Sequence, residues 1–126
     1  MKRVIFVLFL LLAVGCRQSQ QEGVTGTADL TIELLSPLQP TLDGSGEMSV
    51  RITDAAGAPV NDATLSIKGD MTHAGMVPVL AEAAGGQDGL YTFPFAWTMK
   101  GDWIVTARAT LPDGAWAEQQ FDLTVK

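Results

Sequence analysis

The feature that most constrains the fold is a repeated alternation of apolar and polar residues in short segments. In residues 47–53, for example, Met48, Val50 and Ile52 fall on one face and polar side chains on the other. A period of two residues is typical of a β-strand that buries one face. The other segments with strand character are 30–35, 63–68, 77–82, 90–97, 103–111 and 115–125. Because no segment after residue 28 combines helical periodicity with caps, the sequence predicts an all-β protein.

Glycine, proline, aspartate and asparagine separate these segments, which gives about seven strands with turn signals every ~8–12 residues, as in a β-sandwich. Pro112-Asp113-Gly114 is a strong turn signal. Pro94 cannot donate a ladder hydrogen bond, so we expect the strand at 90–97 to lie at a sheet edge or to contain a bulge. The predicted fold class is an immunoglobulin-like β-sandwich of about seven antiparallel strands. The likeness is architectural, because the chain lacks the cysteine pair of true immunoglobulin domains.

The first 16 residues consist of a basic start, an apolar run and a cysteine. Lys2 and Arg3 precede an unbroken apolar run of 11 residues at 4–14. This is the layout of a secretory signal peptide, and the run is too short for a comfortable membrane span. Small residues at 13–15 stand immediately before Cys16, which resembles a bacterial lipobox. We therefore expect cleavage before Cys16 and lipidation of its side chain. The alternative is an ordinary signal peptide followed by an incidental cysteine.

This interpretation divides the chain into three parts. Residues 1–15 are the lipoprotein signal peptide, residues 16–28 are the lipidated cysteine with a flexible polar tether, and residues 29–126 are the domain. Acyl chains on Cys16 would anchor the protein to a membrane, since each buried methylene adds ~0.8 kcal/mol of membrane affinity. The expected location is the cell envelope, with the domain facing the periplasm or the extracellular side. Cys16 is the only cysteine, so no disulfide is expected in the domain.

The chain is acidic. Without Lys2 and Arg3, the remaining six basic and 14 acidic residues give a net charge of −8. A negative surface is repelled by phosphate backbones, so we expect no nucleic acid partner. The carboxylates are scattered, and we expect most of them on solvated strand faces and in turns.

One short segment combines the only histidine with two of the five methionines. His73 lies between Met71 and Met76, in a segment bounded by glycine and proline. In an extended strand, Met71 and His73 would point to the same face. Met99, just before a predicted strand, is a candidate for a third sulfur ligand. Thioether and imidazole ligands suit copper, above all Cu(I), and suit zinc, magnesium and calcium poorly. The predicted Cu(I) ligands are therefore Met71, His73, Met76 and Met99.

A structural interpretation of the same residues stays open. Methionine is common as adaptable core packing, and His73 would then be a surface loop residue. We expect Met48 in the core, because it alternates with other apolar residues in its segment. Trp97 and Trp103 flank Met99, and we interpret them as large core residues at strand ends rather than as a shield for a metal ion.

Three short motifs in residues 69–114 recur together in a known family. They are Met71-Thr72-His73, Gly89-Leu90-Tyr91 and Met99-Lys100-Gly101-Asp102-Trp103. This block resembles the YtkA-like/FixH-like group of small exported domains, with its Met-x-His segment, Gly-x-Tyr strand and Met-x-Gly-x-Trp strand. The resemblance implies a β-sandwich in the cell envelope, linked to copper handling or to the assembly of copper-containing respiratory enzymes. The lipobox and short tether differ from the membrane-anchored form of true FixH proteins.

No enzyme is expected, because the chain has no nucleophile elbow, phosphate-binding loop, zinc-protease motif or dinucleotide fingerprint. The main hypothesis is a lipid-anchored envelope protein that binds Cu(I) and acts in copper handling or copper-enzyme assembly. Its expected partners are the copper ion, the membrane, and a copper-containing oxidase or a copper exporter. The alternative hypothesis is a structural or interaction module without a metal, which docks on an envelope complex through an exposed sheet edge.

Overall fold

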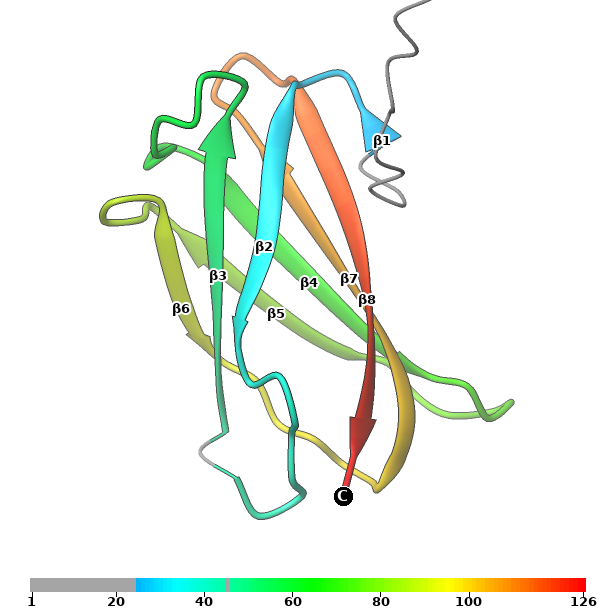
Figure 1. The fold of residues 1–126 in the computed structure, drawn as a ribbon. Coiled ribbons are helices and arrows are strands. Elements are labelled where there is room, and N and C mark those ends of the chain that lie inside the picture. Colours follow the sequence, from blue (N-terminus) through cyan, green and yellow to red (C-terminus); the bar gives the residue numbers. More distant parts are fainter. Residues whose placement is uncertain (1–24, 45) are drawn as a thin grey trace, which may run out of the picture.

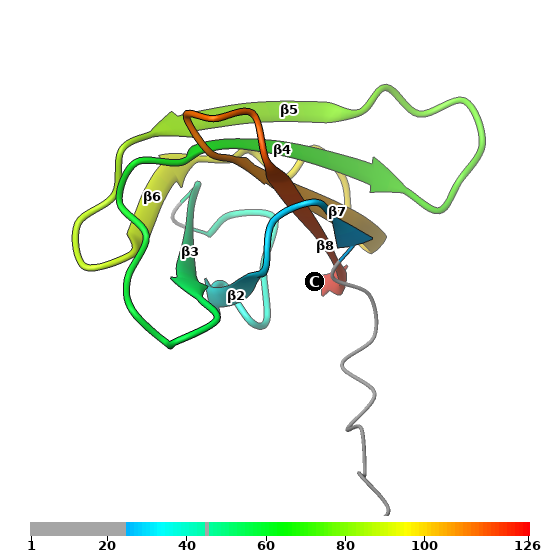
Figure 2. The same ribbon diagram turned by 90° about the horizontal axis from the view of Figure 1, so that it is seen from above.

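The structure, a computed structural model, describes residues 25–44 and 46–126. The predicted signal peptide, Cys16 and residues 17–24 of the predicted tether lie outside the described residues. The described chain forms two antiparallel sheets that face each other, as Figures 1 and 2 show. The prediction of an all-β sandwich is confirmed. Within residues 25–44 and 46–126, no helix is long and apolar enough to cross a membrane.

The two sheets have five and three strands. The larger sheet contains, in spatial order, β1 (Thr25–Gly26), β8 (Trp116–Val125), β7 (Gly101–Thr110), β4 (Thr64–Met71) and β5 (Val79–Ala84). The smaller sheet contains β2 (Leu30–Ser36), β3 (Glu47–Asp54) and β6 (Leu90–Pro94). The longest ladder joins β7 to β8 through ten residue pairs, from Gly101 with Val125 to Thr110 with Trp116. The β7–β8 pair is therefore the most extensively paired part of the larger sheet.

The first strand extends the domain beyond its predicted start at residue 29. Thr25 and Gly26 pair with Glu118 and Ala117 of β8. The backbone N–H groups of the next two residues donate to the carbonyl of Trp116, at 2.8 and 2.9 Å. These bonds need no apolar side chain, so the polar composition of the segment concealed them. With this two-residue strand, the described chain has eight strands rather than about seven.

The strand expected at 90–97 is shorter than predicted. It ends at Pro94, and the next residue, Phe95, donates its N–H to the carbonyl of Gly46 at 2.8 Å. Phe95 is nevertheless buried, which explains why the inward alternation continued past the strand. The predicted edge position is confirmed, because β6 is the last strand of the smaller sheet.

Alternate residues of the facing sheets fill one apolar core. Val50 and Ile52 of β3, Leu65 of β4 and Val105 of β7 are all 0% exposed. Burying such a side chain stabilises the fold by about 1.5–3 kcal/mol. Met48 lies in the same core, as predicted. Because this core is built from described residues, residues 25–126 have what an independent domain requires.

Tyr91 places a polar group inside this core. Its hydroxyl donates to the carbonyl of Val60 at 2.8 Å and accepts from the N–H of Ala63 at 3.2 Å. Burial raises the pKa of the Tyr91 hydroxyl above its usual value of 10.0. The side chain therefore ties the segment before β4 to the smaller sheet.

Candidate metal site

The predicted copper ligands lie on two loops at one end of the sandwich. One loop, residues 72–78, joins β4 to β5, and the other, residues 95–100, leads from β6 into β7. Figure 1 shows both loops at the end where β8 finishes and the C-terminus lies. The strands that carry the loops are adjacent, because β4 pairs with β7. The fold thus brings together two loops that are separated by 16 residues of sequence, 79–94.

Met71 forms a small apolar cluster at this end. It is the last residue of β4, is 8% exposed, and lies opposite Trp103 of β7. Met71, Trp103 and Val125 are the buried members, and Met76, Val79 and Trp97 are partly buried and pack against them. We call this group the Met71 cluster. It places two of the predicted sulfur ligands, Met71 and Met76, in the same apolar surroundings.

The aromatic rings fix the shape of this end. Trp97 makes edge-to-face contacts with Trp103, at 5.4 Å between ring centroids, and with Phe95, at 4.8 Å. Such pairs contribute about 0.5–1.5 kcal/mol beyond the area they bury. The indole N–H of Trp103 donates to the backbone carbonyl of Met99 at 3.1 Å. The structural interpretation of Trp103 is confirmed, since it is among the most buried side chains in the described chain.

The other two predicted ligands are exposed. Met99 is 44% exposed, although its backbone carbonyl accepts a hydrogen bond from the Trp103 indole. His73 is exposed in the turn that follows β4, and Gly75 completes that turn at a φ of 83°. Because β4 ends at Met71, strand alternation does not reach His73, so the shared face expected for an extended strand does not apply to this pair. The structure therefore shows one buried and one partly buried thioether, with the imidazole and a third thioether on the outside.

This set of donor atoms suits only a few metal ions. No group of three or more His, Cys, Asp or Glu side chains that could hold a metal ion occurs in residues 25–44 and 46–126. Zinc and calcium sites are built from such groups. Thioethers in an apolar site, with imidazole nearby, suit Cu(I). If this end of the molecule binds a metal, its chemistry fits copper and does not fit the hard cations.

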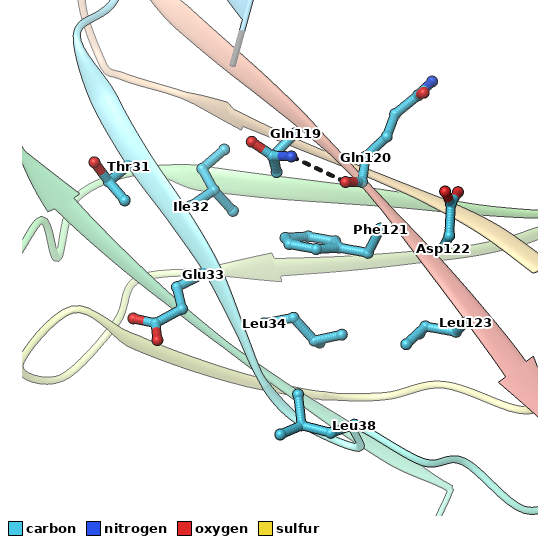
Figure 3. A pocket seen from close by; sticks show the side chains of 10 residues that line it. All are labelled: Thr31, Ile32, Glu33, Leu34, Leu38, Gln119, Gln120, Phe121, Asp122 and Leu123. Atoms are coloured by element: carbon cyan, nitrogen blue, oxygen red, sulfur yellow. Dashed lines mark hydrogen bonds between the residues drawn. The ribbon is translucent and has the colours of Figure 1, made fainter. Parts of the chain in front are cut away.

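A second surface feature had no signal in the sequence. A groove of about 820 Å³ lies between β2 and β8, the two strands at which the sheets meet on one side of the sandwich. Figure 3 shows Ile32 and Leu34 of β2 and Phe121 and Leu123 of β8 extending into the space between the two strands. Each strand alone has ordinary alternation, so only the fold shows that their apolar residues meet at an open side.

The YtkA-like protein family matches residues 25–108. The chain belongs to this family. The match begins at β1 and includes all three motifs that suggested the resemblance, so the sequence-based prediction of the family is confirmed. No curated protein matches the chain.

Several solved structures share the fold of this YtkA-like domain. Superoxide reductase (neelaredoxin) from Ignicoccus hospitalis superimposes with a TM-score of 0.50 at 16% identity, over 80% of this chain and 83% of that one. A variant of the same reductase gives a TM-score of 0.51 at 13% identity, over 76% and 80%. The crystal structure of an engineered protein gives 0.54 at 20% identity, and the match covers 79% of this chain but only 21% of that one. At these identities the likeness concerns the fold alone.

Proposed function

We propose that this YtkA-like protein is a lipid-anchored protein of the cell envelope that binds Cu(I) and acts in copper handling or copper-enzyme assembly. The observation that carries the proposal is the Met71 cluster, in which Met71 and Met76 share an apolar site beside the loop of the only histidine. An apolar site with thioether sulfur favours the soft, singly charged ion over Cu(II) and over zinc.

The arrangement also suits an ion that is exchanged rather than kept. Met71 is almost buried, whereas the side chains of His73 and Met99 are exposed and accessible to an incoming ion. We propose that the exposed pair captures Cu(I) and that the thioethers of Met71 and Met76 complete a soft, low-polarity site. A carrier needs both properties, because it must accept copper from one partner and release it to another.

The proposed anchor limits where this exchange takes place. If Cys16 carries the lipid, eight residues separate it from Thr25, the first residue of β1. Eight residues reach at most about 28 Å when fully extended. The domain would then stay close to the membrane surface, within reach of a membrane-embedded copper-containing oxidase or copper exporter. We propose one of these two kinds of membrane protein as the partner in copper exchange.

The test is a competition titration of residues 17–126 with Cu(I) and a chromogenic chelator. We expect one-to-one binding with a sub-nanomolar Kd, which corresponds to about −12 kcal/mol or tighter. His73→Ala and Met76→Ala should each weaken binding by about 2–3 kcal/mol, a factor of about 30 to 150. Met48→Leu is the matched control, because Met48 is buried in β3 within the main core. Affinity that is indifferent to the first two substitutions would refute the copper site.

A specific observation favours a second function, that of an interaction module without a metal. Val77 and Leu80 are 81% and 72% exposed on the loop and strand at the β5 edge of the larger sheet. Exposed apolar residues on a sheet edge are typical of docking surfaces. This function predicts that the chain copurifies with an envelope complex equally well when Cu(I) binding has been weakened by His73→Ala. Loss of copurification in that variant would instead link docking to the metal.

A further inference from the structure

Within residues 25–44 and 46–126, the outer edge of β8 is covered at both ends and has no partner strand in the middle. At its start, Trp116 accepts hydrogen bonds from the N–H groups of Thr27 and Ala28. At its end, Lys126 donates to the carbonyl of Pro40 at 3.1 Å and accepts from the N–H of Leu42 at 3.0 Å. Between these points, the described chain contributes no strand to this edge. An uncovered stretch of strand offers its backbone groups to another strand.

The direction of these backbone groups follows from the register. In an antiparallel ladder, a residue points its N–H and C=O to the same side, and successive residues alternate. Because Trp116 and Lys126 both point to the free edge, Gln120, Asp122 and Thr124 point there too. The carbonyl of Gln120 accepts from the side-chain amide of Gln119 at 2.9 Å, which Figure 3 shows as a dashed line. A side chain thus occupies part of the place where a neighbouring strand would bond.

The inward side of this open edge is apolar. Side chains of odd-numbered β8 residues point into the sandwich, so that Phe121 and Leu123 face Ile32 and Leu34 across the groove. Leu38, beyond the end of β2, is 68% exposed and extends the same surface. A strand added to β8 would lay every second side chain on this floor and would remove apolar surface from water.

The outward side of the edge is acidic. Asp122 is exposed and points away from the groove floor in Figure 3, and Glu33 of β2 lines the opposite wall. Among the described residues, no lysine or arginine lines the groove. On an added strand, a basic residue opposite Asp122 would form a favourable cross-strand pair. The backbone groups at the β8 edge, the apolar floor of the groove and its acidic rim together define which kind of segment would bind there.

We propose that the groove between β2 and β8 binds an extended segment of a partner protein in which apolar residues alternate with lysine or arginine. The segment adds to the edge at Gln120, Asp122 and Thr124, which is recognition by strand addition. Its apolar side chains contact Phe121 and Leu123, and its basic side chains face the acidic rim. This docking is independent of copper, because the described lining of the groove includes none of the predicted metal ligands.

Two other occupants fit these observations less well. A second copy of the chain would bring one Asp122 edge against another, and two domains of this negative charge repel each other. The chain's own segment before Thr25 is also chemically unsuited. It contains Gln20, Gln21 and Glu22, which cannot supply the apolar alternation that the floor requires.

The test uses residues 17–126 and a blocked seven-residue peptide that alternates lysine and valine. Backbone amide spectra should show the largest shifts at Gln120, Asp122 and Thr124, and these three amides should exchange more slowly with solvent once the peptide is bound. A peptide that alternates glutamate and valine should bind at least tenfold more weakly, since it retains the apolar pattern and reverses the charge.

Two variants locate the site. Asp122→Lys should weaken binding of the lysine–valine peptide at least fivefold, whereas Glu82→Lys, the same charge change on the exposed face of β5, should stay within twofold. Gln120→Pro removes an N–H that points to the free edge and leaves the β7–β8 bonds intact, so it should abolish the slowed exchange of the Asp122 and Thr124 amides. An unchanged thermal unfolding temperature verifies that each variant is folded.

Three outcomes would overturn the proposal. The first is a set of shifts that map to the β5 edge instead of β8. The second is equal affinity for the lysine–valine and glutamate–valine peptides. The third is slow exchange at Gln120, Asp122 and Thr124 before any peptide is added, because the chain itself would then cover the edge. None of these results depends on whether the protein binds copper.

Discussion

The main core and the Met71 cluster are both apolar, but they are built differently. The main core contains residues from both sheets, including seven that are completely buried on four different strands. The Met71 cluster has three buried members and depends on side chains from two loops and on the contacts of Trp97. The main core is therefore specified by the alternation of its strands, and it stabilises the fold. The Met71 cluster is small, contains two thioether side chains, and consists half of partly buried residues.

The largest expected effect is on the main core. Ile52→Ala removes a completely buried side chain from β3 and should lower the free energy of unfolding by about 2–5 kcal/mol. Urea titration followed by tryptophan fluorescence measures this change. Arg51→Ala, on the exposed face of the same strand, is the control and should stay within about 0.5 kcal/mol. A small loss at Ile52 would show that the core is not the main source of stability.

The next prediction separates packing from binding within the Met71 cluster. Met71→Leu keeps the apolar volume, so unfolding should change by less than about 1.5 kcal/mol. The same substitution removes a thioether and should weaken Cu(I) binding by about 2–3 kcal/mol. Chelator competition and urea titration of one sample measure both quantities. If Met71→Leu retains full Cu(I) affinity, Met71 is a packing residue only.

Gly69 lies where the two regions meet, two residues before the end of β4, and pairs with Val105 of β7. A Cβ at this position would lie 2.6 Å from the Phe95 ring and 3.4 Å from the Trp103 ring. Gly69→Ala should therefore cost about 1–3 kcal/mol of stability through overpacking. Ser66→Ala, at an exposed position of β4, is the control. Unchanged stability of Gly69→Ala would mean that the aromatic rings can move apart freely.

Tyr91 gives the main core a pH dependence that the Met71 cluster lacks. Because its pKa is raised in the folded state, the neutral hydroxyl stabilises the fold fully below pH 10. This contribution is lost as the pH rises through the higher folded pKa. Tyr91→Phe should abolish this dependence and should also cost about 1–3 kcal/mol at neutral pH, since it leaves the buried N–H of Ala63 without its partner. Identical stability profiles above pH 10 would contradict the assignment.

The strands of the main core were predictable because burial on one face imposes a period of two. The same rule misplaced two boundaries, the end of the strand predicted at 90–97 and the start of the domain. It continued through Phe95, which is buried although it follows the last residue of β6. It also omitted Thr25 and Gly26, whose pairing with β8 rests on backbone bonds rather than on apolar side chains.

The candidate sites were predictable to different degrees. Ligand chemistry alone singled out the Met71 segment, and the family match passes through it. The position of His73 depends on how the chain turns after β4, which residue spacing does not determine. The groove between β2 and β8 was beyond sequence reasoning, because its two walls are about 90 residues apart and belong to different sheets.

The two-pair ladder between β1 and β8 has a mechanical consequence. It is the shortest ladder in the described chain, and it lies where the polypeptide enters the domain. Tension applied from the N-terminal side reaches these two pairs before it reaches the long ladders of the sheets. Their separation would extend the open edge of β8 from Gln120 back to Glu118, so that a pulled molecule would present a longer edge than a relaxed one.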